Sequence, residues 1–222
     1  QSVKYALGNG TLISGSGCLP AMGYSFAAGT TDGPGEFDFT QATTDNNLLW
    51  DIVRNLLAPP TDEDIACQDP KPILLATGRM VEPYEWHPKV VSTQLAMIGN
   101  VAIAAVPGEF TTMSGRRLKN VIKNAMGNSD ATVIVAGLSN HYTHYITTYE
   151  EYQLQRYEGA STIYGPHTLG IYLKQYEKLA QALISVSFLL ETCYYQRTPY
   201  FDIFFIFIGG NLGTWTRPLH LR

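Results

Sequence analysis

Residues 94–141 read QLAMIGNVAIAAVPGEFTTMSGRRLKNVIKNAMGNSDATVIVAGLSNH, and this stretch decides the fold. Two apolar runs flank Gly99-Asn100, a dipeptide typical of a two-residue hairpin turn. Residues 113–126 follow with apolar side chains at helical spacing, and residues 132–138 form a third apolar run. Strand, helix, strand in this order indicates a crossover connection, so the stretch predicts an α/β fold with a mixed, partly parallel sheet and flanking helices.

Polar side chains follow the predicted strands at one edge of this sheet. Glu109 comes just after one strand, and His141, His144 and Tyr145 come just after the other. Ligands of open α/β sheets bind beyond the carboxyl ends of the strands. We therefore expect these side chains to lie near a functional site.

Two interpretations of these residues remain open from the pattern alone. A carboxylate and imidazoles at one edge suit zinc, but the H-x-x-H spacing of His141 and His144 lacks the surrounding H-E-x-x-H helix. Tyrosines also recur at a spacing of three, four and three residues from position 142 to position 152, which is typical of an aromatic helix face in the core. The sequence contains no G-x-S-x-G motif, the pattern that would indicate a serine nucleophile.

Further elements are expected on both sides of the central stretch. Residues 8–36 are rich in glycine and predict a loop-dominated N-terminal region. Apolar spacing predicts a helix over residues 45–57 and a short strand over residues 73–77. Thr148 and Glu151 form a capping-box pattern that opens a helix running to about residue 164 or 165, and a second helix is expected over residues 169–183.

Composition excludes several classes of protein. The 222 residues contain 45% hydrophobic but only 15% charged residues, which argues against a disordered chain or a solvated coiled coil. The net charge is −4 and no basic run is present, so nucleic acid is not an expected partner. The first residues contain no Met, basic segment or apolar segment, so we expect no signal peptide in this chain.

The last part of the chain changes in character. Residues 203–208 are uncharged and rich in bulky apolar side chains, which is typical of a buried strand or an aggregation-prone one. Charged residues interrupt every apolar span after position 185 that would be long enough to cross a membrane. The three cysteines, Cys18, Cys67 and Cys193, fit no metal-binding spacing and leave open either one disulfide or three free thiols.

Four long motifs resemble the neutral ceramidase family, in particular its animal members. They are PAMGYSFAAGTTDGPG at 20–35, QDPKPILL at 68–75, GEFTTMSGRRL at 108–118 and YEEYQLQRYEGAST at 149–162. The resemblance covers about residues 1–184. It implies the second half, or C-terminal portion, of a catalytic domain, followed by a tail over residues 185–222 that is foreign to the family and expected to be poorly ordered.

The resemblance implies a zinc-dependent amidohydrolase that cleaves ceramide into sphingosine and a fatty acid. Glu109 matches a zinc-binding glutamate, Tyr145 a zinc-binding tyrosine, and Tyr157 a catalytic tyrosine that donates a hydrogen bond to the oxyanion. His141 and His144 then become neighbours of the metal and not its ligands. The family's two zinc-binding histidines and its serine nucleophile, carried by a G-D-V-S-P-N type motif, have no match here, so an incomplete domain is expected.

The resemblance also implies a disulfide between Cys18 and Cys67, ceramide or another sphingolipid as substrate, and a membrane surface as its source. By family, the location is the secretory pathway, the plasma membrane or the extracellular space. Asn9 opens a sequon for N-glycosylation, which matters in that setting. Two further hypotheses remain: a non-catalytic truncated paralogue or splice product that binds lipid or a full-length partner, and a generic α/β binding module.

Overall fold

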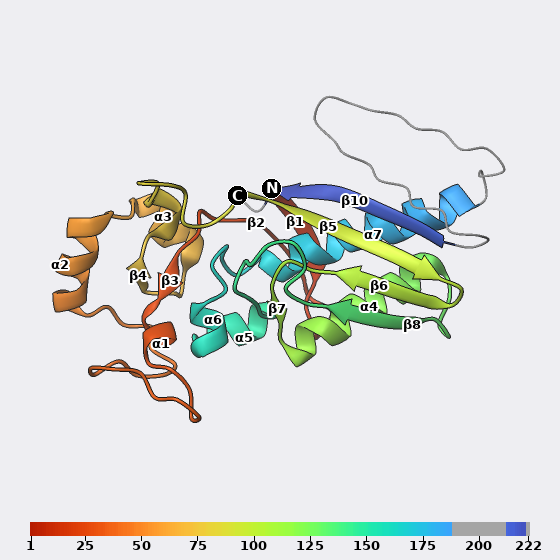
Figure 1. The fold of residues 1–222 in the computed structure, drawn as a ribbon. Helices are drawn as coiled ribbons and strands as arrows, with labels where there is room; N and C mark the ends of the chain where they lie inside the picture. The colour runs from red at the N-terminus through yellow and green to blue at the C-terminus, as the bar shows by residue number, and fades with distance from the viewer. Residues whose placement is uncertain (188–211, 221–222) are drawn as a thin grey trace. The chain divides into compact units, whose positions relative to one another are not determined.

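The structure is a computed structural model that describes residues 1–187 and 212–220 (Figure 1). These residues form two compact units. The first unit comprises residues 1–89 and 143–171 together with His220, and the second comprises the described residues of 90–142 and 172–219.

The second unit contains a four-stranded mixed sheet, as the sequence predicts. Strands β5 (Val90–Ile98) and β6 (Val101–Ala105) pair antiparallel across the turn at Gly99, and β8 (Thr132–Ala136) pairs parallel with β6. Strand β10 (Leu212–His220) lies on the other side of β5, giving the order β10-β5-β6-β8. The hairpin and the parallel crossover are both confirmed.

Helix α4 (Thr112–Met126) forms the crossover between β6 and β8, close to the predicted bounds. The Thr111 hydroxyl accepts the Ser114 amide at its start, and Gly127 ends it with a left-handed φ of 63°. Helix α7 (Thr168–Ser187) packs on the sheet through Gln175, which donates to Thr93. Alternate strand residues such as Leu95, Ala104 and Val133 are buried because one face of the sheet is covered.

The first unit is built mostly from short elements. The glycine-rich N-terminal region is more regular than expected, because β1 and β2 form an antiparallel hairpin whose turn uses Gly10 at a φ of 85°. Helix α2 begins at Leu48, capped by Asn47, and not at residue 45. The elements of this unit are β1 (Ser2–Ala6), β2 (Leu12–Ser16), β3 (Met22–Gly23), α1 (Tyr24–Ala27), α2 (Leu48–Leu57), α3 (Asp62–Gln68), β4 (Ile73–Leu75), η1 (Thr77–Arg79), β9 (Tyr145–Ile146), α5 (Tyr149–Gln153) and α6 (Tyr157–Ala160).

Buried polar groups hold these short elements together. A disulfide joins Cys18 to Cys67 with Cα atoms 5.7 Å apart, as the family resemblance implies. The Gln68 amide donates to the carbonyls of Leu19 and Ile163 at 2.7 Å each. The ammonium of Lys71 is buried between the carbonyls of Ala21 and Thr162, and burial holds its pKa well below the ordinary value.

The helix predicted from position 147 to about position 165 is two short helices instead. Thr148 and Glu151 form the predicted capping box, but α5 ends at Gln153 and α6 starts at Tyr157. Between them Gln155 takes a left-handed φ of 45°, and its buried amide donates to the Tyr152 carbonyl at 2.7 Å. The Tyr152 carbonyl near the end of α5 therefore accepts both the side-chain amide and the backbone amide of Gln155.

Two predictions for the end of the chain fall largely outside the described residues. The apolar run at 203–208 and Cys193 lie there, as does most of the 185–222 tail. Within that tail, the structure describes the end of α7 and the strand β10. No helix among the described residues is both long and apolar enough to cross a membrane.

Candidate active site

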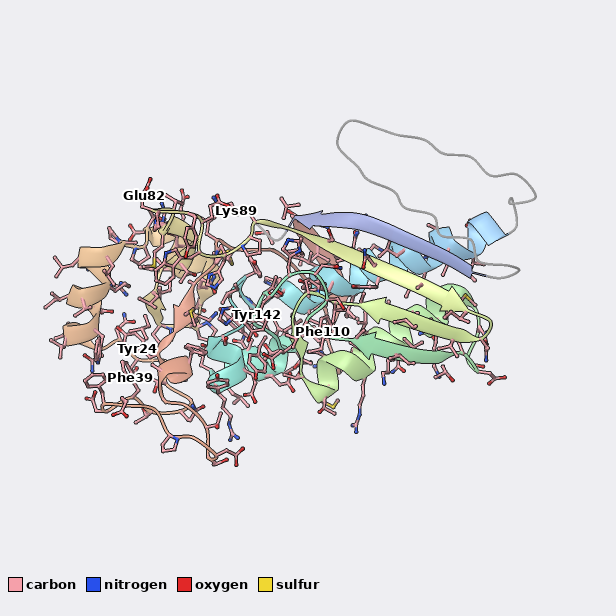
Figure 2. All side chains as sticks on the ribbon, viewed as in Figure 1. Tyr24, Phe39, Glu82, Lys89, Phe110 and Tyr142 are labelled. Carbon is pink, nitrogen blue, oxygen red and sulfur yellow. A yellow bond between two sulfur atoms is a disulfide. The ribbon has the colours of Figure 1, made fainter. Side chains whose placement is uncertain are left out.

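Glu109 lies in the second unit, directly after the sheet edge that the sequence predicts. It opens the short strand β7 (Glu109–Phe110), which precedes α4. The Tyr142 hydroxyl donates to Glu109 Oε1 at 2.7 Å, although Tyr142 itself is 47% exposed. Figure 2 labels Tyr142, which belongs to the loop between β8 and β9. A half-buried carboxylate with one oxygen already engaged keeps its second oxygen for another partner.

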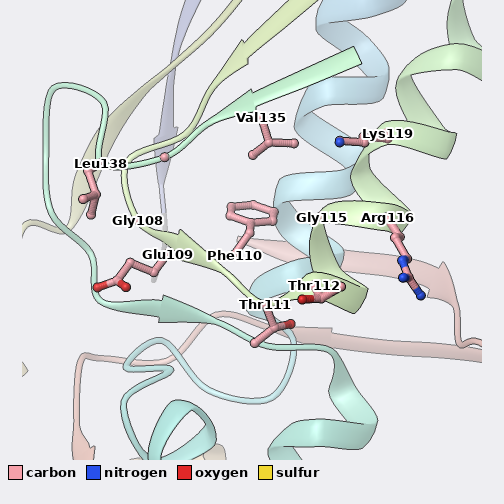
Figure 3. A pocket seen from close by; sticks show the side chains of 11 residues that line it. Gly108, Glu109, Phe110, Thr111, Thr112, Gly115, Arg116, Lys119, Val135 and Leu138 are labelled. Atoms are coloured by element: carbon pink, nitrogen blue, oxygen red, sulfur yellow. The ribbon is translucent and has the colours of Figure 1, made fainter. Parts of the chain in front are cut away.

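A cavity of about 600 Å³ lies beside Glu109 within the same unit. The loop after β6, the first turns of α4 and the end of β8 line it, so it sits at the carboxyl ends of two parallel strands. Figure 3 shows the Glu109 carboxylate on one side of this cavity and Arg116 on α4 on the other. Thr111 and Lys119 also contribute to its wall.

Tyr145 and Tyr157 lie together in the first unit. Their rings meet edge to face with centroids 5.7 Å apart. Phe26 stacks on Tyr157 at 5.3 Å, and the Tyr157 amide donates to Gln41 Oε1 at 2.8 Å. Tyr157 is the first residue of α6, whereas the single helix predicted from Thr148 to about residue 164 or 165 would have placed it in a helix interior.

His144 is bonded through both ring nitrogens in the first unit. Its Nε2 lies 3.0 Å from Nε2 of His87, and its Nδ1 lies 3.0 Å from the Ser161 hydroxyl. Burial, assisted by the nearby His144, lowers the pKa of His87 to about 4. His87 is therefore neutral near pH 7 and can share only one proton with its neighbour.

The structure places Tyr145 beside Tyr157, whereas the proximity of Glu109 to Tyr145 stays a prediction. Glu109 belongs to the second unit and Tyr145 to the first, so their convergence on one metal ion remains a prediction. His141 and His144 likewise fall in different units.

The tyrosines with helical spacing do not form one helix face. Tyr142 lies in a loop, Tyr145 in β9, and only Tyr149 and Tyr152 lie on α5. The chain bends at the left-handed His144 and passes through an extended segment before α5, which breaks the period.

Sequence reasoning missed three partners of the site residues. His87, Ser161 and the Tyr142 contact with Glu109 carry no periodic signal, because each depends on a distant segment of the chain. The bulky, proline-flanked segment around His87 (YEWHP, 84–88) is the one feature of the sequence that could have drawn attention to it.

The donor atoms suit zinc only in part. A carboxylate and an ionised phenol are acceptable zinc ligands, but zinc sites in proteins use three or four protein ligands. In the part of the chain that the structure describes, no three His, Cys, Asp or Glu side chains gather in a way that could hold a metal ion. Glu109 and Tyr145 do not by themselves complete a zinc site.

Comparison with known proteins identifies relatives over most of the chain. The family described as "Neutral/alkaline non-lysosomal ceramidase, N-terminal" matches residues 1–174. Neutral ceramidase from Drosophila melanogaster is 63% identical over 171 residues, and neutral ceramidase 3 from Arabidopsis thaliana is 55% identical over 172 residues. Each match covers 76% of this chain and 24% of the relative. Because plant proteins match as well, the expectation of an animal member remains a prediction.

Solved structures of ceramidases are also similar to this chain. A ceramidase complexed with C2 has a TM-score of 0.63 at 32% identity and covers 84% of this chain and 30% of its own. The neutral ceramidase from Pseudomonas aeruginosa has a TM-score of 0.59 at 29% identity, with 84% and 28% covered. The chain therefore spans about a quarter of the length of the curated relatives quoted above. With the predicted fold confirmed and most of its length matched, the chain belongs to the neutral/alkaline non-lysosomal ceramidase family.

Proposed function

We propose that this chain supplies part of the active site of a ceramide amidohydrolase, which cleaves N-acylsphingosine into sphingosine and a fatty acid. The observation that carries the proposal is the family match over residues 1–174, which includes the segments that contain Glu109, Tyr145 and Tyr157. Relatives named neutral ceramidase are 51% to 63% identical over segments of similar length.

Amide hydrolysis requires stabilisation of a tetrahedral oxyanion. In this proposal the Tyr157 hydroxyl donates a hydrogen bond to that oxyanion, and removing such a donor typically costs about 10²-fold or more in turnover. The ring of Tyr157 is held between Phe26 and Tyr145, so its hydroxyl has a defined direction before substrate arrives. Glu109 keeps one oxygen bonded to Tyr142, which fixes the carboxylate on the wall of its cavity.

Zinc is part of the proposal as a bound cofactor. Glu109 and Tyr145 would supply two of its ligands, and the ion would contribute Lewis-acid chemistry and a bound water of lowered pKa. No GDVSPN-type serine motif occurs in residues 1–222, and the two ligands alone leave the metal site incomplete. We therefore expect this chain by itself to bind zinc weakly and not to hydrolyse ceramide.

A second candidate is a non-catalytic product of the family that binds lipid or a full-length partner. The observation that favours this alternative is that, within residues 1–187 and 212–220, no three His, Cys, Asp or Glu side chains gather as a metal site. Lipid vesicles containing ceramide, or a complete neutral ceramidase, are the probes that would detect such binding. Retention on either, without turnover in any context, would support the alternative over the hydrolase.

We also propose that the protein passes through the secretory pathway, where ceramide reaches it from a membrane surface. The Cys18–Cys67 disulfide is typical of an oxidising compartment. Asn9 is exposed at the turn between β1 and β2. Expression in secreting cells, with and without Asn9→Gln, should show one glycan as a shift in apparent mass.

The function is tested in a complete enzyme that carries this sequence. Residues 1–174 would replace the matching segment of the Drosophila melanogaster neutral ceramidase, which is 63% identical over 171 residues. This parent chimera should hydrolyse ceramide and lose activity with a chelator. A parent chimera that folds and binds zinc but gives no turnover would contradict the proposal.

Three variants assign the roles within that chimera. Tyr157→Phe should lower kcat about 10²-fold with zinc content unchanged, because only an oxyanion donor is lost. Glu109→Ala should lose both zinc and activity. Tyr149→Phe, on the neighbouring helix α5, is the matched control and should retain both. Full activity of Tyr157→Phe would remove that residue from the mechanism.

A further inference from the structure

His144 occupies a constrained place in the first unit, directly before Tyr145 in the sequence. Its backbone takes a left-handed φ of 58°, which is uncommon outside glycine. Both ring nitrogens lie 3.0 Å from a polar atom, Nε2 from His87 Nε2 and Nδ1 from the Ser161 hydroxyl. A strained backbone held by side-chain bonds on both sides of one ring is a feature found at functional sites.

The bonds of His144 lead to both tyrosines of the proposed active site. The Ser161 carbonyl accepts the Tyr145 amide at 3.3 Å, and the Ser161 amide donates to the Tyr157 carbonyl at 3.0 Å. One residue, Ser161, therefore links the His144 ring to the backbone of Tyr145 and to helix α6, which begins at Tyr157.

Phe26 supplies a second connection between the same groups. Its ring meets His144 edge-on with centroids 6.0 Å apart and stacks on Tyr157 at 5.3 Å. The imidazole of His144 and the phenol of Tyr157 thus pack against one aromatic ring. A shift of His144 would move the surface on which Tyr157 rests.

We infer that His144 is a positioning residue for Tyr157 and Tyr145, and that His87 and Ser161 fix its ring. The inference rests on the proposed function and deepens it, because it names residues that orient the oxyanion donor without touching substrate. It assigns a role to His87, which lies 57 residues earlier in the sequence. Histidine is suited to this place because it has two ring nitrogens and tolerates the left-handed region better than most residues.

The hydrogen bonds from His87 through His144 to Ser161 all run in one direction if each imidazole takes the tautomer that leaves no buried ring N–H without an acceptor. His87 Nε2–H donates to His144 Nε2, and His144 Nδ1–H donates to the Ser161 oxygen. His87 Nδ1, which is buried and has no partner among the described residues, is then an acceptor and not a donor. Buried N–H groups without a partner are rare in proteins, and buried acceptors without one are somewhat less rare, which favours this arrangement.

The test uses variants of the parent chimera described above, measured for kcat, KM and zinc content. His144→Gly removes the ring yet allows the left-handed backbone, so it separates the role of the side chain from that of the backbone. We expect kcat to fall about tenfold to a hundredfold, with KM within twofold and zinc content unchanged, because a small displacement of the donor affects the transition state most.

His144→Asn and Ser161→Ala probe the link to α6. Asparagine tolerates the same backbone and places an amide near the position of Nδ1, so His144→Asn should restore part of the loss seen in His144→Gly. Ser161→Ala should lower kcat in the same direction, and it decides the question if His144→Gly fails to fold. Asn140→Gly, which changes another left-handed residue with a φ of 66°, is the matched control and should keep the parent kcat.

The outcomes separate this inference from the proposed function. If the parent chimera is active and Glu109→Ala is inactive, but His144→Gly and Ser161→Ala keep kcat within twofold, the positioning role is wrong while the function stands. Loss of zinc in His144→Gly would also overturn it, because His144 would then act at the metal. If the parent chimera itself shows no turnover, the function fails and this inference fails with it.

Discussion

The two units of this chain are stabilised in different ways. In the second unit, α4 and α7 bury an apolar face of the sheet, and Leu118 and Ile122 of α4 are 0% exposed. In the first unit, elements of two to ten residues are joined by a disulfide, a buried lysine and buried amide and hydroxyl groups. The first unit carries Tyr145, Tyr157 and the His87–His144–Ser161 chain, whereas the second carries Glu109.

This difference matters for how the proposed active site tolerates change. Polar contacts are directional, and a buried group left without its partner costs about 1–3 kcal/mol. They therefore hold side chains in one arrangement more strictly than apolar packing does. We therefore expect the first unit to depend on individual polar contacts and the second unit on buried apolar area.

The largest effect is expected from the disulfide of the first unit. The double variant Cys18→Ala/Cys67→Ala opens a loop with a sequence separation of 49 residues, which should cost about 4 kcal/mol on the chain-entropy treatment. Hydrogen exchange can show that the loss of stability falls on the first unit, because the backbone amide of residue 18 donates to the Tyr164 carbonyl there. That amide should lose protection.

The Val106 amide, which donates to the Ala136 carbonyl in the second unit, is the internal control and should keep its exchange rate. Thiol counting on the unmodified chain under denaturing, non-reducing conditions should also find one free thiol, Cys193. Three free thiols, or equal loss of protection in both units, would contradict the assignment.

The second effect tests the apolar core of the second unit. Leu118→Ala removes a fully buried side chain from the contact between α4 and the sheet and should lower the free energy of unfolding by about 3 kcal/mol. Protection of the Val106 amide should fall, and that of the Cys18 amide should not. An unchanged melting profile would mean that the face of α4 is less tightly packed than its burial indicates.

The sequence predicts these two units to very different degrees. Gly99-Asn100, the stripe of α4 and the run of β8 are local signals, and the hairpin, crossover and mixed sheet follow from them. The first unit depends on pairs such as Gln68 with Ile163, which are 95 residues apart, and His87 with His144. Sequence periodicity carries no information about such distant pairs. The disulfide could therefore be predicted only from the family resemblance, and the His87–His144–Ser161 chain could not be predicted.

A smaller effect is expected from pH in the first unit. Burial, with the neighbouring His144, lowers the pKa of His87 to about 4 in the folded state, below the ordinary value of 6.5. The unfolded chain therefore binds more protons between these values, and stability is lost as the pH falls from about 6.5 towards 4. Allowing for the partial exposure of His87, the loss should be about 2 kcal/mol.

The measurement is the difference between the unmodified chain and His87→Phe, because other groups titrate in the same range. Denaturant unfolding at pH 7 and pH 4.5, followed by protection of first-unit amides, should show a steeper pH dependence for the unmodified chain. Parallel pH profiles for the two proteins would show that His87 is not held in its neutral form by the fold.

The smallest effect concerns α2, which breaks the rule that an apolar helical stripe marks a core. Its spacing predicts a helix as well as that of α4 does, and a helix forms at Leu48–Leu57. Yet Leu48 is 83% and Leu56 is 82% exposed within the described part of the chain. Periodicity thus reports the helix, while burial depends on what the stripe contacts.

Leu56→Ser should accordingly change the free energy of unfolding by less than about 0.5 kcal/mol, because little apolar surface is removed from contact. The same substitution at Leu118, which is 0% exposed, should cost more than Leu118→Ala does, since it removes the buried apolar side chain and also buries a hydroxyl. Both variants would be measured by denaturant unfolding and by sedimentation at two concentrations. If Leu56→Ser lowered the free energy of unfolding by more than about 1 kcal/mol, and by more at higher protein concentration, α2 would be covered by another molecule in solution. Stability that depends on association changes with protein concentration.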